Sequence, residues 1–296
     1  MRRLFKLALA LGLIAAAAMW VATAARPLPD SATAGLRGGP VRGEMIFWAA
    51  GCASCHMAPG ARGDAELVLA GGQRFASGFG TFIAPNISND PDQGIGTWTT
   101  ADLANALLRG VSPQGTHYYP ALPYASYAKM TVQDVADLRV FLATLPADAT
   151  PSLPHELGFP FTIRRSIGVW KLLYLNTAWV IPDPLTAQET RGRYLVEAQA
   201  HCGECHTPRT ALGGMDRSRW LAGAPNPSGT GRIPGITPGT LTWTEGEIVD
   251  YLTSGFTPDF DSVGGHMVHV VENMARLPET DRRAIAAYLK RVPAVP

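Results

Sequence analysis

Two short motifs each place two cysteines and a histidine at the same close spacing. The chain contains CASCH from Cys52 to His56 and CGECH from Cys202 to His206. Residues three and four positions apart share one face of a helix. The two thiols of each motif can therefore add to the two vinyl groups of one haem, while the adjacent histidine reaches its iron. These two motifs use all 4 cysteines of the chain.

Other uses of paired cysteines fit this sequence less well. A zinc ribbon keeps its two C-x-x-C pairs roughly 15–20 residues apart, whereas Cys52 and Cys202 lie in opposite halves of the chain. A redox-active pair expects a βαβ context, and structural disulfides would leave the histidines without a role. The sequence therefore predicts two covalently bound haem c groups. The residues expected to hold them are Cys52, Cys55, Cys202 and Cys205 as thioethers, with His56 and His206 as iron ligands.

Each haem histidine needs a partner for its second ring nitrogen, usually a carbonyl, to fix its tautomer and orientation. Pro59 and Pro208 lie in the turns that follow the two motifs. A backbone carbonyl of these turns is expected to accept that hydrogen bond. Either proline could equally well do no more than end its helix.

A second ligand would complete each iron, and methionine or histidine is usual in electron-transfer haems. In the first half Met130 is the predicted ligand and His117 the alternative. In the second half Met267 follows Gly264-Gly265 in an expected loop, so that its side chain can turn toward a haem. Met274 is expected in the core, where methionine often fills gaps. That methionine or a histidine would be the alternative ligand.

The segments that carry these residues occur twice along the chain. Three blocks recur in the same order, with one residue inserted in the second copy of the first block. The matching blocks are 43–56 with 192–206, 97–113 with 242–258, and 134–147 with 281–294. Two long copies indicate duplication of one small domain rather than a solenoid, whose repeats are shorter and more numerous.

Each copy is expected to consist of a few helices joined by long loops. Thr99 and Thr244 are predicted N-caps followed by acidic residues. Thr131 with Asp134 resembles a capping box, and Pro278 suits a first helical turn. Apolar residues recur at three and four positions in the last block, and no convincing strand alternation is present. The sequence predicts an all-α fold.

The N-terminus has the features of an export signal. Arg2, Arg3 and Lys6 precede an apolar run over residues 7–25, which is close to the ~20 residues that span a bilayer. Residues 1–26 are therefore a predicted membrane anchor or, alternatively, a cleaved signal sequence. Either interpretation places the rest of the chain outside the cytoplasm. The net charge of +1, without a basic stripe, disfavours nucleic acid as a partner.

Besides the two CxxCH motifs, longer strings of residues resemble those of a known family. These strings are 79–103 (FGTFIAPNISNDPDQGIGTWTTADL), 117–130 (HYYPALPYASYAKM) and 201–214 (HCGECHTPRTALGG). With them the chain resembles class I c-type cytochromes, specifically the membrane-associated cytochrome c subunits of periplasmic alcohol, gluconate and aldehyde dehydrogenases. One departure is Leu122, which stands where such proteins often have methionine in a Pro-Ala-Met-Pro string. This departure favours Met130 as the ligand of the first haem.

The resemblance implies two tandem class I domains, at 38–147 and 187–296, joined by a linker at 148–186. It also implies an electron carrier on the periplasmic side of the bacterial cytoplasmic membrane rather than an enzyme. A dehydrogenase would donate electrons, and a quinone, cytochrome or terminal oxidase of the respiratory chain would accept them. The alternative is a dihaem redox enzyme of the peroxidase or thiosulfate-oxidising type, which needs an open iron.

The middle of the linker mixes apolar and basic residues, from Phe161 to Leu175. The simpler interpretation is a segment that packs across both domains. The alternative is a docking or membrane-surface segment, because basic amphipathic stretches can lie in a membrane interface.

Overall fold

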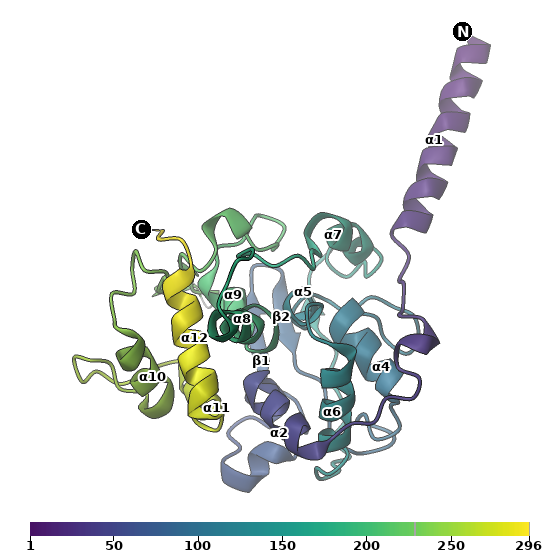
Figure 1. Cartoon of the computed structure of the whole chain (residues 1–296). Helices are drawn as coiled ribbons and strands as arrows, with labels where there is room; N and C mark the ends of the chain where they lie inside the picture. Colours follow the sequence, from purple (N-terminus) through teal and green to yellow (C-terminus); the bar gives the residue numbers. More distant parts are fainter. Residues whose placement is uncertain (228, 296) are drawn as a thin grey trace.

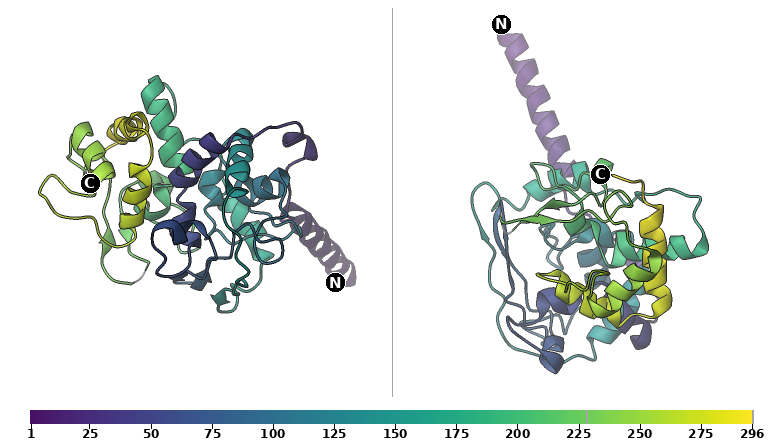
Figure 2. Two further views of the ribbon diagram at one scale, coloured as in Figure 1. Left: turned by 90° about the horizontal axis from the view of Figure 1, so that it is seen from below. Right: turned by 90° about the vertical axis from the view of Figure 1, so that its left-hand side faces the viewer.

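The computed structural model describes residues 1–227 and 229–295. Figure 1 shows a mostly helical body from which one helix projects. This helix, α1 (Arg2–Ala22), has no buried residue, and its mean hydropathy of 2.1 is high enough for a membrane span. The further views in Figure 2 show α1 leaving the body in the same isolated way. The expected N-terminal helix is therefore formed.

A pair of crossed helices builds the core of each half. In the first half α2 packs on α6, and in the second half α8 packs on α12. The bounds of these helices are Pro40–Ala49 for α2, Val132–Leu142 for α6, Ala187–Tyr194 for α8 and Glu279–Arg291 for α12. The duplication predicted from the sequence is thus visible as two equivalent helix pairs.

Glycine allows both helix pairs to approach closely. A Cβ atom on Gly43 would lie 2.1 Å from the backbone oxygen of Asp137. A Cβ atom on Gly192 would lie 1.9 Å from the backbone oxygen of Ala284. Because neither backbone could move away without separating the helices, any side chain at these two positions would disrupt the core.

The third helix of each half begins and ends as its sequence suggests. Thr99 and Thr244 form the predicted N-caps, each within a reciprocal capping box. These helices are α4 (Thr100–Ala104), which continues as the π-helical η3 (Asn105–Arg109), and α10 (Glu245–Ser254). Left-handed glycines end both helices, Gly110 with φ 58° and Gly255 with φ 79°.

The residue inserted in the second half is accommodated inside a helix. After α8 the chain continues as the π-helical η4 (Leu195–Gln199), which leads toward the second CxxCH motif. A π-helical turn takes up one extra residue without breaking the helix. The insertion therefore leaves the two motifs in equivalent positions.

Short strands are the main difference from the all-α expectation. Each strand has only two to four residues, too few for a recognisable alternation of apolar and polar positions. The first three form one antiparallel sheet and the last two a second one. They are β1 (Arg74–Ser77), β2 (Gly80–Ile83), β3 (Glu156–Leu157), β4 (Ala224–Pro225) and β5 (Arg232–Ile233).

The remaining helices are short. They are η1 (Asp30–Ala32), α3 (Cys52–His56), η2 (Gly63–Leu67), α5 (Tyr124–Tyr127), α7 (Ser166–Tyr174), α9 (Gly203–His206), η5 (Arg217–Arg219) and α11 (Met267–Ala275). Both CxxCH motifs thus lie on helices of their own, α3 and α9. The helix α7 belongs to the segment between the two halves.

Candidate functional site

The two CxxCH motifs follow a sharp change of backbone direction. Gly51 with φ 63° precedes α3, and His201 with φ 44° occupies the same place before α9. No two of the four cysteines are joined in a disulfide. Among the described residues, no group of three or more His, Cys, Asp and Glu side chains could hold a metal ion.

Both motif histidines are oriented by a backbone carbonyl from a distant loop. The Nδ1 atom of His56 lies 2.8 Å from the oxygen of Pro85, and that of His206 lies 2.8 Å from the oxygen of Pro234. A carbonyl can only accept, so Nδ1 must donate, which leaves Nε2 free to bind a metal. Burial lowers the pKa of both imidazoles, which favours the neutral form that iron ligation needs.

The expectation that Pro59 or Pro208 lies in the turn that supplies this carbonyl is wrong. Both residues follow their motifs closely, but the accepting oxygens belong to Pro85 and Pro234. A second pair of equivalent hydrogen bonds joins the chain that leads into these distant loops to the motif histidines. The oxygens of His56 and His206 accept from the backbone nitrogens of Gly71 and Gly223, each at 2.7 Å.

The loops that follow the motifs repeat a signal that the sequence comparison missed. Leu69 and Leu221 both have left-handed backbones, with φ 59° and φ 58°. Each begins the tripeptide Leu-Ala-Gly, whose glycine makes the hydrogen bond to the motif histidine. Non-glycine residues rarely adopt this conformation. The tripeptide thus marks a second constrained point in each half.

One pair of contacts differs between the halves in a compensating way. Gly203 lies inside the second motif, and a Cβ atom there would be 2.2 Å from the ring of Trp220. The corresponding residue of the first motif is Ala53, and the residue before Leu69 is Val68 rather than tryptophan. The second half therefore combines a small residue with a large one where the first half has two of intermediate size.

Each motif is contacted by the opposite half of the chain. Ser126 of α5 donates a hydrogen bond of 2.9 Å to Oε1 of Glu204 in the second motif. Asn273 of α11 donates one of 2.8 Å to Oγ of Ser54 in the first motif. Ser126 and Asn273 each lie five residues before the N-cap of the last helix of their own half. The two halves therefore pack with approximate two-fold symmetry.

A second symmetric pair of contacts flanks the first. Lys129 forms an ion pair with Glu197 at 3.7 Å, and both side chains are almost fully buried. At the equivalent position Arg276 lies over the ring of Trp48, 4.0 Å from its centroid. The same place in each half thus contributes a cation to the opposite half, although its partner differs.

An aromatic pair lies between the two motifs. The hydroxyl of Tyr127 donates to the oxygen of Ala50, two residues before Cys52, at 3.0 Å. The Tyr127 ring stacks on that of His201, which precedes Cys202, with centroids 5.4 Å apart. The two motifs therefore face each other across the interface of the halves.

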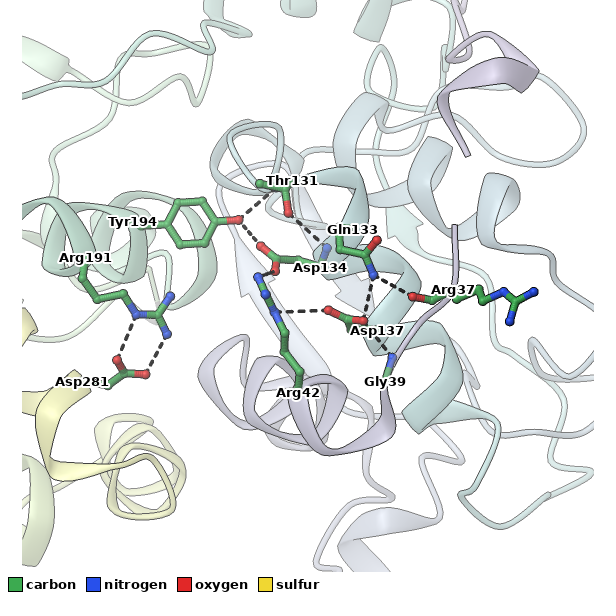
Figure 3. A network of polar contacts seen from close by, with 10 residues as sticks. All are labelled: Arg37, Gly39, Arg42, Thr131, Gln133, Asp134, Asp137, Arg191, Tyr194 and Asp281. Carbon is green, nitrogen blue, oxygen red and sulfur yellow. Dashed lines mark hydrogen bonds and ion pairs between the residues drawn. The ribbon is translucent and has the colours of Figure 1, made fainter. Parts of the chain in front are cut away.

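Charged residues of the core helices connect the helix pairs (Figure 3). Asp134 accepts from Arg42 and from the hydroxyl of Tyr194, a residue of the other half. Thr131 accepts from the backbone nitrogen of Asp134 at 3.1 Å, so only half of the expected capping box forms. The carboxylate of Asp134 instead accepts from Tyr194 of the other half. The equivalent pair of the second half joins Arg191 to Asp281 at 2.7 Å.

The candidate second iron ligands lie in different local structures. Met130 is buried in the hydrophobic core just before α6. Met267 is partly buried at the first position of α11, and Met274 is buried further along that helix. His117 directs Nε2 to the oxygen of Thr23 at 2.9 Å. This hydrogen bond uses one ring nitrogen of His117, while Nδ1 is buried without a hydrogen-bond partner among the described residues.

The two methionines are not equivalent in the duplicated structure. Gly110 accepts from the backbone nitrogen of Tyr118, and Gly255 accepts in the same way from Val263, each at 2.8 Å. Leu122 lies four residues after Tyr118, and Met267 lies four residues after Val263. Met267 therefore occupies the position equivalent to Leu122. The departure noted in the sequence thus falls at the position that carries methionine in the second half.

The geometry defines a class of protein: a c-type cytochrome with two haem-attachment sites that face each other. The model of the cytochrome c family matches residues 40–146. The chain is 58% identical, over all 296 residues and the whole of the relative, to a dihaem c-type cytochrome of Cereibacter sphaeroides. The chain therefore belongs to the cytochrome c family, and it carries two covalently bound haem c groups.

Further relatives are longer than this chain. The cytochrome subunit of fructose dehydrogenase from Gluconobacter japonicus is 37% identical over 86% of this chain and 52% of the relative. The cytochrome c subunit of a quinone alcohol dehydrogenase from Gluconobacter oxydans is 33% identical over 100% of this chain and 62% of the relative. The chain thus spans about half to three-fifths of these two subunits.

Proposed function

We propose that this protein relays single electrons in the periplasm from a dehydrogenase to a quinone, cytochrome or terminal oxidase, without chemistry on a substrate of its own. Bound haem supplies one-electron oxidation and reduction at iron. The facing arrangement of the two CxxCH motifs, with Tyr127 and His201 stacked between them, carries this proposal. It is supported by relatives whose names describe cytochrome subunits of dehydrogenases.

The proposed roles of the site residues follow from their geometry. Cys52, Cys55, Cys202 and Cys205 attach the two groups as thioethers. His56 and His206 would bind iron through Nε2, because Pro85 and Pro234 occupy Nδ1. Met130 and Met267 would supply the second ligand of the two irons and so exclude exogenous ligands. The corresponding domains are 38–147 and 187–296, with 148–186 as the linker.

The buried surroundings of the site suit a carrier. Tyr127 and Val196 are buried within the hydrophobic core that surrounds the motifs. An apolar, rigid environment changes little between redox states, so little reorganisation accompanies electron transfer. The cross-half contacts of Ser54 and Glu204 hold the two attachment helices at a fixed separation. These residues therefore position the redox groups rather than react.

We place the protein on the periplasmic side of the cytoplasmic membrane with α1 retained as an anchor. Helix α1 is long and apolar enough to cross a bilayer. Arg2, Arg3 and Lys6 at its start favour a cytoplasmic N-terminus. Its C-terminal end is also attached to the body, because His117 donates to the oxygen of Thr23. A helix that is only a cleavable signal needs no such contact.

The relay is tested by exposing the purified, reduced holoprotein to carbon monoxide and following its absorption spectrum. If both irons are closed by side chains, the spectrum stays unchanged. Rapid binding at either iron would overturn the relay proposal and favour a dihaem enzyme. The Cys202→Ala/Cys205→Ala variant provides the control: its mass after denaturation should exceed that of the bare chain by one haem instead of two.

A further inference from the structure

Helix α7 directs its charged side chain into the body of the protein. Nζ of Lys171 donates to the backbone oxygens of Arg109 at 2.6 Å and Gly110 at 2.7 Å. The same nitrogen lies 4.8 Å from the centroid of the Tyr124 ring. Burial lowers the pKa of Lys171 to about 8. This cation thus stabilises the C-terminal end of the π-helical η3 and is directed into the protein.

The two arginines just before α7 also contact the protein, although Arg164 is exposed. Arg164 donates to the oxygen of His117 at 3.1 Å, and its guanidinium lies 4.8 Å from the centroid of the Tyr119 ring. Arg165 lies over the ring of Trp20 in α1, 4.2 Å from its centroid. The basic residues of this segment are therefore engaged with the protein.

The outward face of α7 is apolar. Val169, Leu172 and Leu173 are 41%, 57% and 61% exposed. Their spacing of three and four residues places them on one side of the helix. A surface helix of a soluble protein normally presents charged residues to water and apolar residues to the core. Helix α7 has the opposite pattern, which marks this face as an interaction surface.

This face adjoins the base of the candidate membrane span. Gly168 packs against Thr23 at the end of α1, so closely that a Cβ atom would lie 2.2 Å from the Thr23 oxygen. Figure 1 shows α7 on the side of the body from which α1 projects. Trp20 lies in the last turn of α1, and tryptophan is enriched where a span meets the membrane–water interface. Arg165 contacts Trp20, so α7 begins at that level.

We infer that the outward face of α7, formed by Val169, Leu172 and Leu173, inserts into the lipid surface of the membrane that α1 enters. This inference rests on the proposed membrane location and adds a second contact with the bilayer. Lipid is the occupant that the position favours, because the face is continuous with a helix that enters the bilayer. Amphipathic helices bury such a face roughly 5–10 Å into the headgroup region.

The consequence of this second contact is a fixed orientation of the body. A single helix would leave the body free to rotate around a flexible connection. Two contacts side by side restrict that rotation. The segment 148–186, which crosses from one half to the other, would then hold both haem-attachment motifs at a constant angle to the membrane.

The test uses the full-length holoprotein, reconstituted into vesicles of phosphatidylcholine and phosphatidylglycerol. Because haem attachment consumes all 4 native cysteines, Leu172→Cys introduces a single thiol for a nitroxide spin label. Val140→Cys provides the matched control, since Val140 is 36% exposed on α6. Relaxation of the label by oxygen reports lipid, and relaxation by a water-soluble nickel chelate reports water.

The label at position 172 is expected to show an oxygen-to-nickel ratio several-fold higher than the label at position 140. Equal ratios in a vesicle-bound protein would overturn the inference. A label shielded from both reagents would also overturn it, because that result indicates coverage by protein. The haem absorption spectrum confirms folding, and intact mass shows whether α1 is retained. Failure of the anchor is therefore detected separately, and the carbon monoxide experiment tests the relay independently of this label.

Discussion

Asn273 donates a hydrogen bond of 2.8 Å to Ser54 in the opposite half of the chain. Its counterpart joins Ser126 to Glu204 at 2.9 Å. In both cases the segment before the last helix of one half contacts the residue before the second cysteine of the other half. The same surface is therefore used twice, as in a two-fold symmetric dimer. The haem-attachment helices lie within this interface.

The buried Lys129 should contribute more to the free energy of unfolding than its symmetric counterpart Arg276. Lys129→Met leaves the carboxylate of Glu197 buried without its cation, which should lower the free energy of unfolding by about 3 kcal/mol. Three hydrogen bonds to that carboxylate remain, so the cost should not be larger. Arg276→Met, the matched control, loses only an interaction with Trp48 and should cost about 1 kcal/mol. Equal losses in urea denaturation would contradict this assignment.

The second motif should not tolerate the alanine that the first motif contains. Gly203→Ala would place a methyl group against Trp220 and should destabilise the protein by about 1–3 kcal/mol. Combining it with Trp220→Val recreates the residues of the first half and should recover stability relative to Trp220→Val alone. Thermal unfolding of the four proteins measures this coupling. Additive losses would show that the two positions do not compensate.

Stability should fall at mildly acidic pH because His117 must stay neutral. Burial, then the charges of Lys171 and Arg165, lower its pKa below the usual 6.5. Below about pH 6.5 the unfolded chain therefore binds a proton that the folded chain does not, so stability decreases as the pH falls. His117→Gln keeps a donor for the Thr23 oxygen and should flatten this slope. The measurement is the denaturation midpoint between pH 5 and 8, compared between the two proteins.

Removing a second iron ligand should lower one reduction potential. Met267→Ala should affect only the second haem and Met130→Ala only the first, because methionine ligation raises the potential. Axial ligands set haem potentials over a range of roughly 0.8 V, so the shift should be clear in a redox titration. Met274→Leu is the control and should leave both potentials in place. A titration that responds to Met274→Leu and not to Met267→Ala would reverse the assignment.

Local signals in the sequence predicted much of this structure. Thr99 and Thr244 cap their helices as expected, because a capping box involves only four consecutive residues. The duplicated fold followed from blocks of residues that are contiguous in the chain. The inserted residue in the second copy was visible in the same comparison, and η4 (Leu195–Gln199) explains how it fits.

Contacts between distant segments could not be predicted in the same way. Pro85 and Pro234 orient the motif histidines from irregular loops, and no periodicity marks a loop carbonyl. Pro59 seemed suitable only because it is near in sequence. The pairing of Tyr127 with His201 was missed for a related reason, since it depends on how the halves pack. Duplication indicates that two halves exist, but not which surfaces meet.

The joining of both halves in one chain changes what their interface must supply. The connection through 148–186 makes the association of the two halves intramolecular, which gives each half a high effective concentration around the other. An interface that would be too weak to hold two separate molecules together is then sufficient. Its individual contacts can therefore differ between the halves, as they do at the equivalent positions Trp48 and Glu197, which hold their cations in different ways.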